Sequence, residues 1–289
     1  MILTKKRLLA AGFTFLLFCA AAFGAWWYLA PAGEAAKEQF SVRFLDVGQG
    51  DCALIACGGR FALIDAGPGA RAERTVQLLR DLGVRDLELA IVTHGHEDHA
   101  GGMAAVLDRF PVGRLVLPVE NNRSGFWIDM LSAAGESEIT EVSAGWRYRL
   151  GEAVITVLYP TPEERAAAAD LNDTSLVIRV EYRDAGFYLA GDCSAAGEAV
   201  LLQREPPQPV TVYKVSHHGS SDASSAALLA ALSPRYCAIS CAAQNEYGHP
   251  HRATLDRLEA LGIPVYRTDT MGTLAFVYEN GLLRPVTDY

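Results

Sequence analysis

The chain has 289 residues, half of them apolar and a fifth charged, a composition that predicts a globular protein able to bury a sizeable core. Its net charge is −9, from 25 basic and 34 acidic residues. That sign excludes a protein that binds nucleic-acid backbones by overall charge alone, so a polyanionic substrate would have to be held by metal ions and a few placed donors.

The N-terminal segment differs from the rest of the chain. Basic residues 5–7 precede an almost unbroken apolar run from Leu8 to Ala30, long enough to cross a bilayer, which needs about 20 residues. Aromatic residues 26–28 near its end are typical of a membrane interface. Residues 1–30 are therefore predicted to form one apolar helix that anchors the chain in a membrane.

A cleaved signal peptide is the alternative for the same segment, because small residues near its end are suited to cleavage. Both interpretations place the remainder outside the cytoplasm, tethered in the first case and secreted in the second. Residues 31–39 are predicted to be a linker, and residues 40–289 a single domain.

Short apolar runs punctuated by glycine begin at Phe40 and predict strands, whereas longer amphipathic runs predict helices. In the first half we expect three strands within 40–67, then helix 71–82, strand 87–93, helix 99–110, strand 114–119 and helix 124–135. The second half predicts strands at 138–142, 146–158, 174–182, 186–190, 210–216, 235–240, 263–267, 272–279 and 282–286, with helices at 195–204, 223–232 and 252–261. Residues 160–173 are expected to be a polar insertion. This alternation predicts an α/β fold of sheets covered by helices.

The seven histidines fall into three short patches, which indicates a shared site: residues 94–99, 217–218 and 249–251. The first patch, THGHEDHAGG, follows a predicted buried strand. His94 and His96 can aim at one ion, and Asp98 and His99 at a second. Imidazole and carboxylate suit zinc, and also manganese or iron. The sequence therefore predicts a metal site.

The HxHxDH pattern at 94–99, with LIDAG at 63–67 upstream, resembles the metallo-β-lactamase superfamily. Five further motifs narrow the resemblance to the hydrolase domain of the ComEC competence proteins: FLDVGQGD (44–51), LNDTSLVIRV (171–180), LAGD (189–192), VSHHGS (215–220) and YGHPH (247–251). The resemblance implies an αββα sandwich with two divalent metal ions at the edge between the sheets, zinc as the first expectation and manganese as the second. We expect a standalone domain without the multi-span competence channel.

The resemblance also implies the remaining ligands. Asp192 would bridge the two metals, with a helix N-cap as its alternative role. Of the pair at 217–218, His218 is the expected ligand and His217 the catalytic group that faces the substrate. Asp98 would both bind metal and orient the nucleophile. Asp65 is expected to hydrogen-bond the histidine loop rather than bind metal.

One departure from the superfamily concerns the first metal. Many members supply a third histidine there, but this chain has none between His99 and His217. The corresponding place holds Asn172 and Asp173, either of which would be a weak ligand, with water as the alternative. Occupancy of this first site is therefore the weak point of the prediction.

Other polar residues are assigned to the substrate or to turns. Ser220, His249 and His251 are expected to position the substrate, with a helix-entry role as the alternative for the two histidines. The polar loop of Asp46, Gln49 and Asp51 is interpreted as a hairpin turn that can also rim the cleft.

The function expected from these features is an exported, metal-dependent phosphodiesterase or nuclease in which a metal-bridging hydroxide attacks phosphorus. Its partners would be a phosphodiester such as single-stranded DNA, the membrane through the N-terminal segment, and DNA-uptake machinery. Two alternatives stay open: a hydrolase of a small cell-surface ester of the phosphorylcholine type, and a non-catalytic accessory protein with a degenerate metal site.

Overall fold

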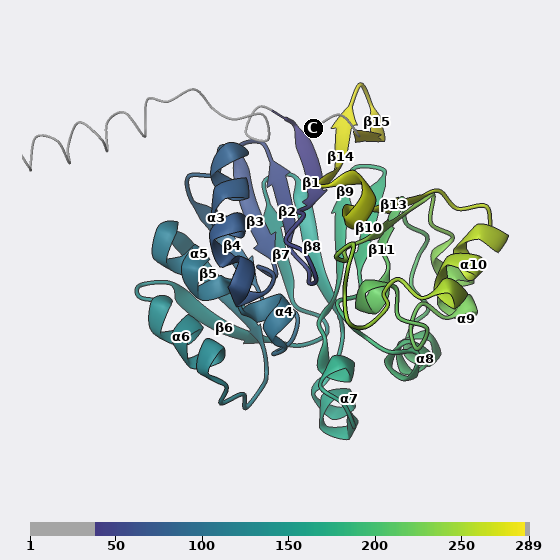
Figure 1. The fold of residues 1–289 in the computed structure, drawn as a ribbon, viewed down its shortest axis with the longest axis horizontal. Coiled ribbons are helices and arrows are strands. Elements are labelled where there is room, and N and C mark those ends of the chain that lie inside the picture. The colour runs from purple at the N-terminus through teal and green to yellow at the C-terminus, as the bar shows by residue number, and fades with distance from the viewer. Residues whose placement is uncertain (1–37, 287–289) are drawn as a thin grey trace, which may run out of the picture. The chain divides into compact units, whose positions relative to one another are not determined.

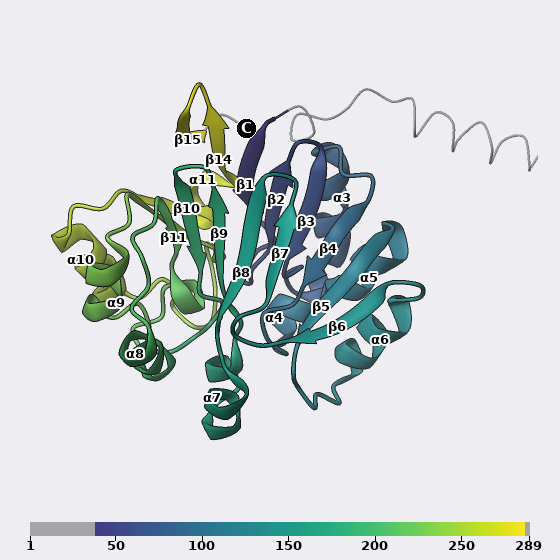
Figure 2. The same cartoon turned by 180° about the vertical axis from the view of Figure 1, so that it is seen from behind.

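In the computed structural model, which describes residues 38–286, two mixed β-sheets pack face to face and carry helices on their outer sides (Figures 1 and 2). The first sheet has eight strands in the order β15-β14-β1-β2-β3-β4-β5-β6. Their bounds are β1 Phe40–Phe44, β2 Ala53–Cys57, β3 Arg60–Ile64, β4 Leu87–Ile91, β5 Val112–Pro118, β6 Glu138–Val142, β14 Leu274–Glu279 and β15 Leu282–Val286. Strands β3 to β6 run parallel, and the others pair antiparallel.

The second sheet has seven strands in the order β13-β12-β11-β10-β9-β8-β7. Their bounds are β7 Arg147–Leu150, β8 Ala153–Tyr159, β9 Val177–Tyr182, β10 Ala185–Leu189, β11 Val212–Lys214, β12 Tyr236–Ile239 and β13 Val265–Arg267. Strands β10 to β13 run parallel. Each sheet thus has one parallel block, and the carboxyl ends within a block share an edge, which is where open α/β sheets bind ligands.

Helices cover the outer face of each sheet. On the first sheet α3 (Ala72–Asp81), α5 (Met103–Arg109) and α6 (Gly125–Ala133) bury one apolar side each against the strands. On the second sheet α8 (Ala195–Arg204), α9 (Ala226–Leu232) and α10 (Arg252–Ala260) do the same. The short elements are α4 Glu97–Ala100, α7 Pro162–Ala167, α11 Thr268–Met271 and the 3-10 helices η1 Gly69–Arg71, η2 Asn172–Thr174 and η3 Ser216–Gly219.

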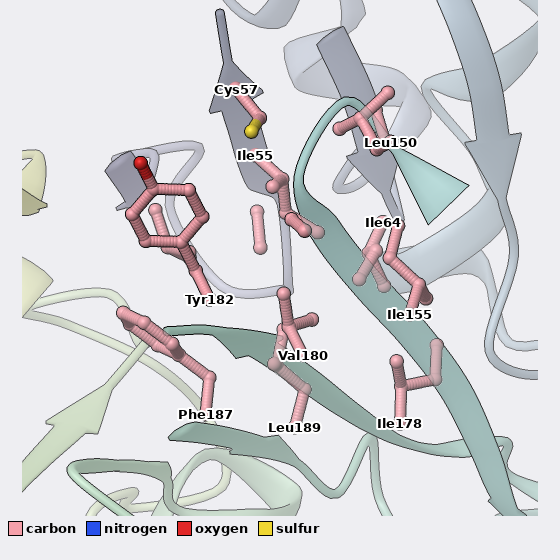
Figure 3. Close-up of a cluster of buried hydrophobic side chains, with 14 of the residues drawn as sticks. Ile55, Cys57, Ile64, Leu150, Ile155, Ile178, Val180, Tyr182, Phe187 and Leu189 are labelled. Carbon is pink, nitrogen blue, oxygen red and sulfur yellow. The ribbon is translucent and has the colours of Figure 1, made fainter. Parts of the chain in front are cut away.

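The main core lies between the two sheets. Alternate residues of the central strands point into it, and Figure 3 shows Ile55 and Ile64 of the first sheet near Ile155, Ile178 and Val180 of the second. The residues in between point outward under the helices, as Leu54 and Leu63 do. Strands buried on both faces explain why the sequence shows continuous apolar runs instead of an alternating pattern.

The α/β architecture expected from the sequence is therefore confirmed for the described residues, with two local corrections. The single strand expected at 146–158 is a hairpin, because Gly151 takes a left-handed φ of 59° and turns the chain between β7 and β8. The insertion at 160–173 contains α7, which begins with a capping box in which Thr161 and Glu164 bond each other's backbone N–H.

The apolar helix and anchor expected at residues 1–30, and residues 31–37 of the linker, lie outside the described residues. None of the helices between residues 38 and 286 has the length and apolar character of a membrane span.

Candidate metal centre

The histidine patches meet where the parallel blocks of the two sheets end. His94 and His96 follow β4 in the first sheet. In the second sheet Asp192 follows β10, and His217 and His218 follow β11. Residues 120 positions apart are brought together because both blocks present their carboxyl ends at the same edge of the sandwich: His218 Nε2 lies 3.1 Å from Asp98 Oδ2.

Four residues gather in one cluster, which we call the four-ligand half: the half-buried Asp98 and the buried His99, Asp192 and His218. One ligand atom from each lies within 4.8 Å of all the others. Asp192 is central, with Oδ1 3.2 Å from His99 Nε2 and Oδ2 3.6 Å from His218 Nε2.

Two buried atoms in this half, His99 Nε2 and Asp192 Oδ1, lie 3.2 Å apart, and neither makes a hydrogen bond. Buried polar atoms are costly to leave unpaired, and an ion between them would satisfy both. Nitrogen and carboxylate ligands at this spacing suit a divalent cation of the zinc or manganese type. The residues present therefore fit the metal that the motif implies.

The other pair, which we call the two-histidine half, is less complete. His94 Nε2 approaches His96 Nδ1 to 3.1 Å and lies 4.0 Å from Asp192 Oδ2, so the Asp192 carboxylate reaches both halves. Between residues 38 and 286, however, no third His, Cys, Asp or Glu gathers with this pair as closely as in the four-ligand half.

The two residues expected to stand in for the missing histidine lie in η2. Asn172 lines the pocket beside the cluster, and its Oδ1 is buried without a partner. Asp173 is already used, because its Oδ1 accepts hydrogen bonds from the backbone N–H and the hydroxyl of Ser194 at the start of α8. Of the two expected substitutes, Asn172 is thus the one that faces the site.

The pocket that is lined by residues of both halves has a volume of about 410 Å³. Its walls come from six separate segments of the chain, and they are lined by Gln49, His96, Glu97, Asp98, Asn172, Asp192, His217, His218, Tyr247 and His249. No lysine or arginine is among these lining residues.

Comparison with known proteins agrees with this geometry. Residues 45–242, more than half of the chain, match the Metallo-beta-lactamase superfamily. The chain belongs to that superfamily. It is 30% identical over 270 residues to ComE operon protein 3 of Bacillus subtilis and 32% identical over 249 residues to competence protein ComA of Neisseria gonorrhoeae. Each match covers 84% of this chain but only 34% and 33% of the relative, so the chain spans about a third of their length.

Among solved structures, the metallo-β-lactamase fold protein YhfI of Bacillus subtilis aligns with a TM-score of 0.55 at 9% identity, over 82% of this chain and 99% of YhfI. That likeness bears on the fold alone. Together the comparisons show a metallo-β-lactamase domain related to competence proteins, as the motifs predicted.

Two buried carboxylates stand behind the histidines of this metallo-β-lactamase site. Asp65 Oδ2 lies 2.8 Å from His99 Nδ1, and Thr93 donates both its backbone N–H and its hydroxyl to Asp65. Hydrogen bonds of this kind orient a metal-binding imidazole and fix which nitrogen faces the ion. The hydrogen bonds of Asp65 thus go to the histidine loop, at His99 and Thr93.

The equivalent carboxylate for the second histidine is Asp51, which sequence reasoning left in a hairpin turn. Its Oδ1 lies 3.3 Å from His218 Nδ1, which also contacts the carbonyl oxygen of Ser240 at 2.9 Å. Lys214 Nζ lies 2.5 Å from Asp51 Oδ2, and both side chains are almost fully buried. Burial raises the pKa of Asp51, but the charges of Lys214 and His218 outweigh it and hold the pKa at about 2.

The glycine-rich GQGD motif explains how Asp51 reaches this position. Gly50 has a φ of 141°, and a Cβ atom there would stand 2.2 Å from the carbonyl oxygen of Asp98. The Asp51 backbone N–H donates to that same carbonyl at 3.1 Å. Only glycine lets the loop pack this closely on the histidine loop. The GQGD motif is visible in the sequence. Lys214, the ion-pair partner of Asp51, lies far along the chain, and no motif around it indicates this pairing.

His217 and His218 have unusual backbones. Both have left-handed φ angles, 50° and 53°, which cost on the order of 1–2 kcal/mol per residue. As a result the two rings diverge: His218 is 1% exposed in the cluster, whereas the His217 side chain is 21% exposed and lines the pocket. His217 Nε2 lies 3.8 Å from Asp192 Oδ2.

Of the three residues expected to position the substrate, only His249 lines the pocket. Burial, together with neighbouring His218 and His217, lowers the pKa of His249 to about 4. His251 instead has both ring nitrogens on the backbone, Nδ1 accepting from Ser221 N–H and Nε2 near the carbonyl of Tyr247. Ser220 is buried, outside the lining of the pocket, with its carbonyl accepting from Thr254.

Proposed function

We propose that this chain is a metal-dependent phosphodiesterase that cleaves single-stranded DNA outside the cytoplasm. The observation that carries the proposal is the four-ligand half, Asp98, His99, Asp192 and His218, with its unpaired buried nitrogen and oxygen atoms. The relatedness to competence proteins supports a nucleic-acid substrate in preference to the β-lactam after which the superfamily is named.

Zinc or manganese ions bound here would supply the Lewis acidity that activates water and offsets negative charge on the reacting phosphate. The protein groups around them have separable tasks. The Asp98 side chain is 29% exposed and faces the pocket, where it can orient the attacking water. His217 lines the same pocket and can donate a proton to the leaving oxygen.

The proposed setting follows from the N-terminal sequence. The apolar run after the basic residues 5–7 would tether the domain to a membrane, or export it if the run is cleaved, and DNA-uptake machinery is the partner suited to a domain related to competence proteins.

One structural observation favours a second candidate, a non-catalytic accessory protein. The two-histidine half gathers no third strong ligand within the described residues. In this second candidate, the chain binds a single ion in the four-ligand half, and that ion only stabilises the fold.

The deciding experiment uses the full chain, purified in detergent, stripped with a chelator and resupplied with Zn²⁺ or Mn²⁺. A single-stranded oligonucleotide and p-nitrophenyl phosphorylcholine are offered as substrates to the wild type and to His99→Ala. We expect metal-dependent cleavage of the oligonucleotide that His99→Ala abolishes. Turnover of the choline ester alone would identify a small-ester hydrolase, and bound metal without turnover of either substrate would identify the accessory protein.

A further inference from the structure

Tyr247 is unusual among the aromatic residues of this chain. Within residues 38–286 it is the one aromatic side chain among the exposed large hydrophobics, and 64% of its surface is open to solvent. It also lines the pocket above the metal cluster. The other phenylalanine, tyrosine and tryptophan rings between residues 38 and 286 are at least partly buried, so an exposed tyrosine at the mouth of a site suggests a ligand with an apolar face.

The loop that carries Tyr247 is held firmly. The Asn245 side chain donates to the carbonyls of Ala242 and His249 at 2.9 and 2.7 Å and accepts from the His249 backbone N–H at 2.9 Å. His251 joins this loop to the loop after the metal ligands, since one ring nitrogen contacts the Tyr247 carbonyl and the other accepts from Ser221 N–H. The tyrosine is thus presented from a braced backbone.

Gly219 allows the two loops to meet. Its φ is 88°, and a Cβ atom there would stand 2.5 Å from Pro250 Cβ. The His251 backbone N–H donates to the Gly219 carbonyl at 2.9 Å. The position of Tyr247 is therefore tied directly to the turn that carries His217 and His218.

The ring itself is also oriented. Tyr247 stacks on His249, with ring centroids 5.6 Å apart and an interplanar angle of 22°, and His249 in turn meets His217 at 5.3 Å. A continuous row of rings runs from the pocket wall to the solvent. Two amide side chains, Gln49 and Asn172, line the same pocket, and each has a buried polar atom without a partner.

A nucleic-acid substrate in this pocket finds no cationic groove, because no lysine or arginine lines it and the chain is acidic. Affinity beyond the metal contacts must then come from elsewhere. Stacking of a base on an aromatic ring supplies it without basic residues and tolerates every base, since each has a π face.

We propose that Tyr247 is a stacking platform for one unpaired nucleobase, whose adjacent phosphodiester lies at the metal cluster. The inference deepens the proposed phosphodiesterase function and rests on it. The platform selects single-stranded nucleic acid, because bases inside a duplex have no free face. It does not suit a choline headgroup, since a quaternary ammonium is held by a cage of several aromatic faces and Tyr247 is the one tyrosine, tryptophan or phenylalanine among the lining residues.

The test compares two fluorescent oligomers of equal length and charge, an oligothymidylate and its abasic counterpart, both phosphorothioate-linked to slow hydrolysis. Binding to the full chain is followed by anisotropy at a fixed Mn²⁺ concentration. Wild type should bind the base-bearing oligomer roughly 5- to 100-fold more tightly than the abasic one. Tyr247→Ala should lose that preference while its affinity for the abasic oligomer stays the same, which also shows that the variant is folded.

Tyr247→Phe keeps the ring and should keep the preference, as should Leu261→Ala, which removes an exposed apolar side chain outside the pocket. Equal affinity of wild type for both oligomers, or a preference that survives in Tyr247→Ala, would overturn the platform. Cleavage of unmodified oligomers in the same samples tests the phosphodiesterase separately. Cleavage without base preference would refute only the stacking role of Tyr247, and base preference without cleavage would refute only the proposed phosphodiesterase activity.

Discussion

The two halves of the metal centre differ in how their histidines are supported. In the four-ligand half, His99 and His218 each have a buried carboxylate at Nδ1, Asp65 and Asp51 respectively. In the two-histidine half, His94 Nδ1 has only the hydroxyl of Thr93, at 3.2 Å. One six-residue motif supplies ligands to both halves, so the motif alone does not set affinity. Ligands and supports from distant segments do, and the four-ligand half should hold its ion more tightly.

Removal of the central carboxylate should have the largest effect. Asp192→Ala takes away the group that reaches both halves, so we expect loss of tightly bound metal and cleavage at the level of the metal-free control. Metal content after gel filtration and oligonucleotide cleavage measure this. Asp256→Ala is the matched control, because that carboxylate is exposed on α10 and lies outside both the cluster and the pocket. Tight metal binding retained in Asp192→Ala would refute the assignment.

Loss of the buried cation behind His218 should mainly reduce stability. Lys214→Met removes the cation from the buried Asp51 carboxylate and leaves it only His218, which should lower the free energy of unfolding by about 3–5 kcal/mol in urea titration. The double variant Asp51→Asn with Lys214→Met should regain most of that stability, yet bind metal about 10- to 100-fold more weakly because His218 has lost its carboxylate. A double variant with wild-type metal affinity would show that the pair serves the fold alone.

The carboxylates and the lysine behind the metal-binding histidines could be predicted from the sequence only in part. The fold and the near-contiguous ligands were accessible, since apolar periodicity identifies strands and HxHxDH places four candidate ligands in six residues. The capping box that starts α7 was also visible but was included in an insertion. Asp51 and Lys214 were not accessible, because their pairing depends on how β11 of one sheet lies against a loop of the other. His251 illustrates the same limit. Its spacing from His249 predicts that both rings face the metal site, but the His251 backbone is held by Gly219 in the left-handed turn at 217–219, and its ring contacts the backbone of Ser221 and Tyr247 instead.

A smaller effect is expected in the two-histidine half. His96→Ala should spare the tight ion and remove a weaker one, so metal content at saturating Mn²⁺ falls while the affinity of the first equivalent stays unchanged. Competition with a chromophoric chelator separates the two. A first equivalent weakened as much as in His99→Ala would contradict the difference between the halves.

The smallest effect should be a gain. Asn172→His places an imidazole at a position that already lines the pocket, where the resemblance predicts the weak ligand. We expect the second equivalent to bind up to about tenfold more tightly, with Asn172→Ala as the control that removes the amide without adding a ligand. If the histidine variant binds the second metal equivalent no more tightly than Asn172→Ala does, the side chain at position 172 does not contact the ion.

The most direct test of a metal-dependent hydrolase built on the four-ligand half is a metal titration of the chelator-stripped full chain, with bound metal and oligonucleotide cleavage read in the same samples. Cleavage should be absent without metal, rise with the first tightly bound equivalent, and fail to rise in His99→Ala. Cleavage that persists after chelation, or a wild type that binds no divalent ion, would contradict the account.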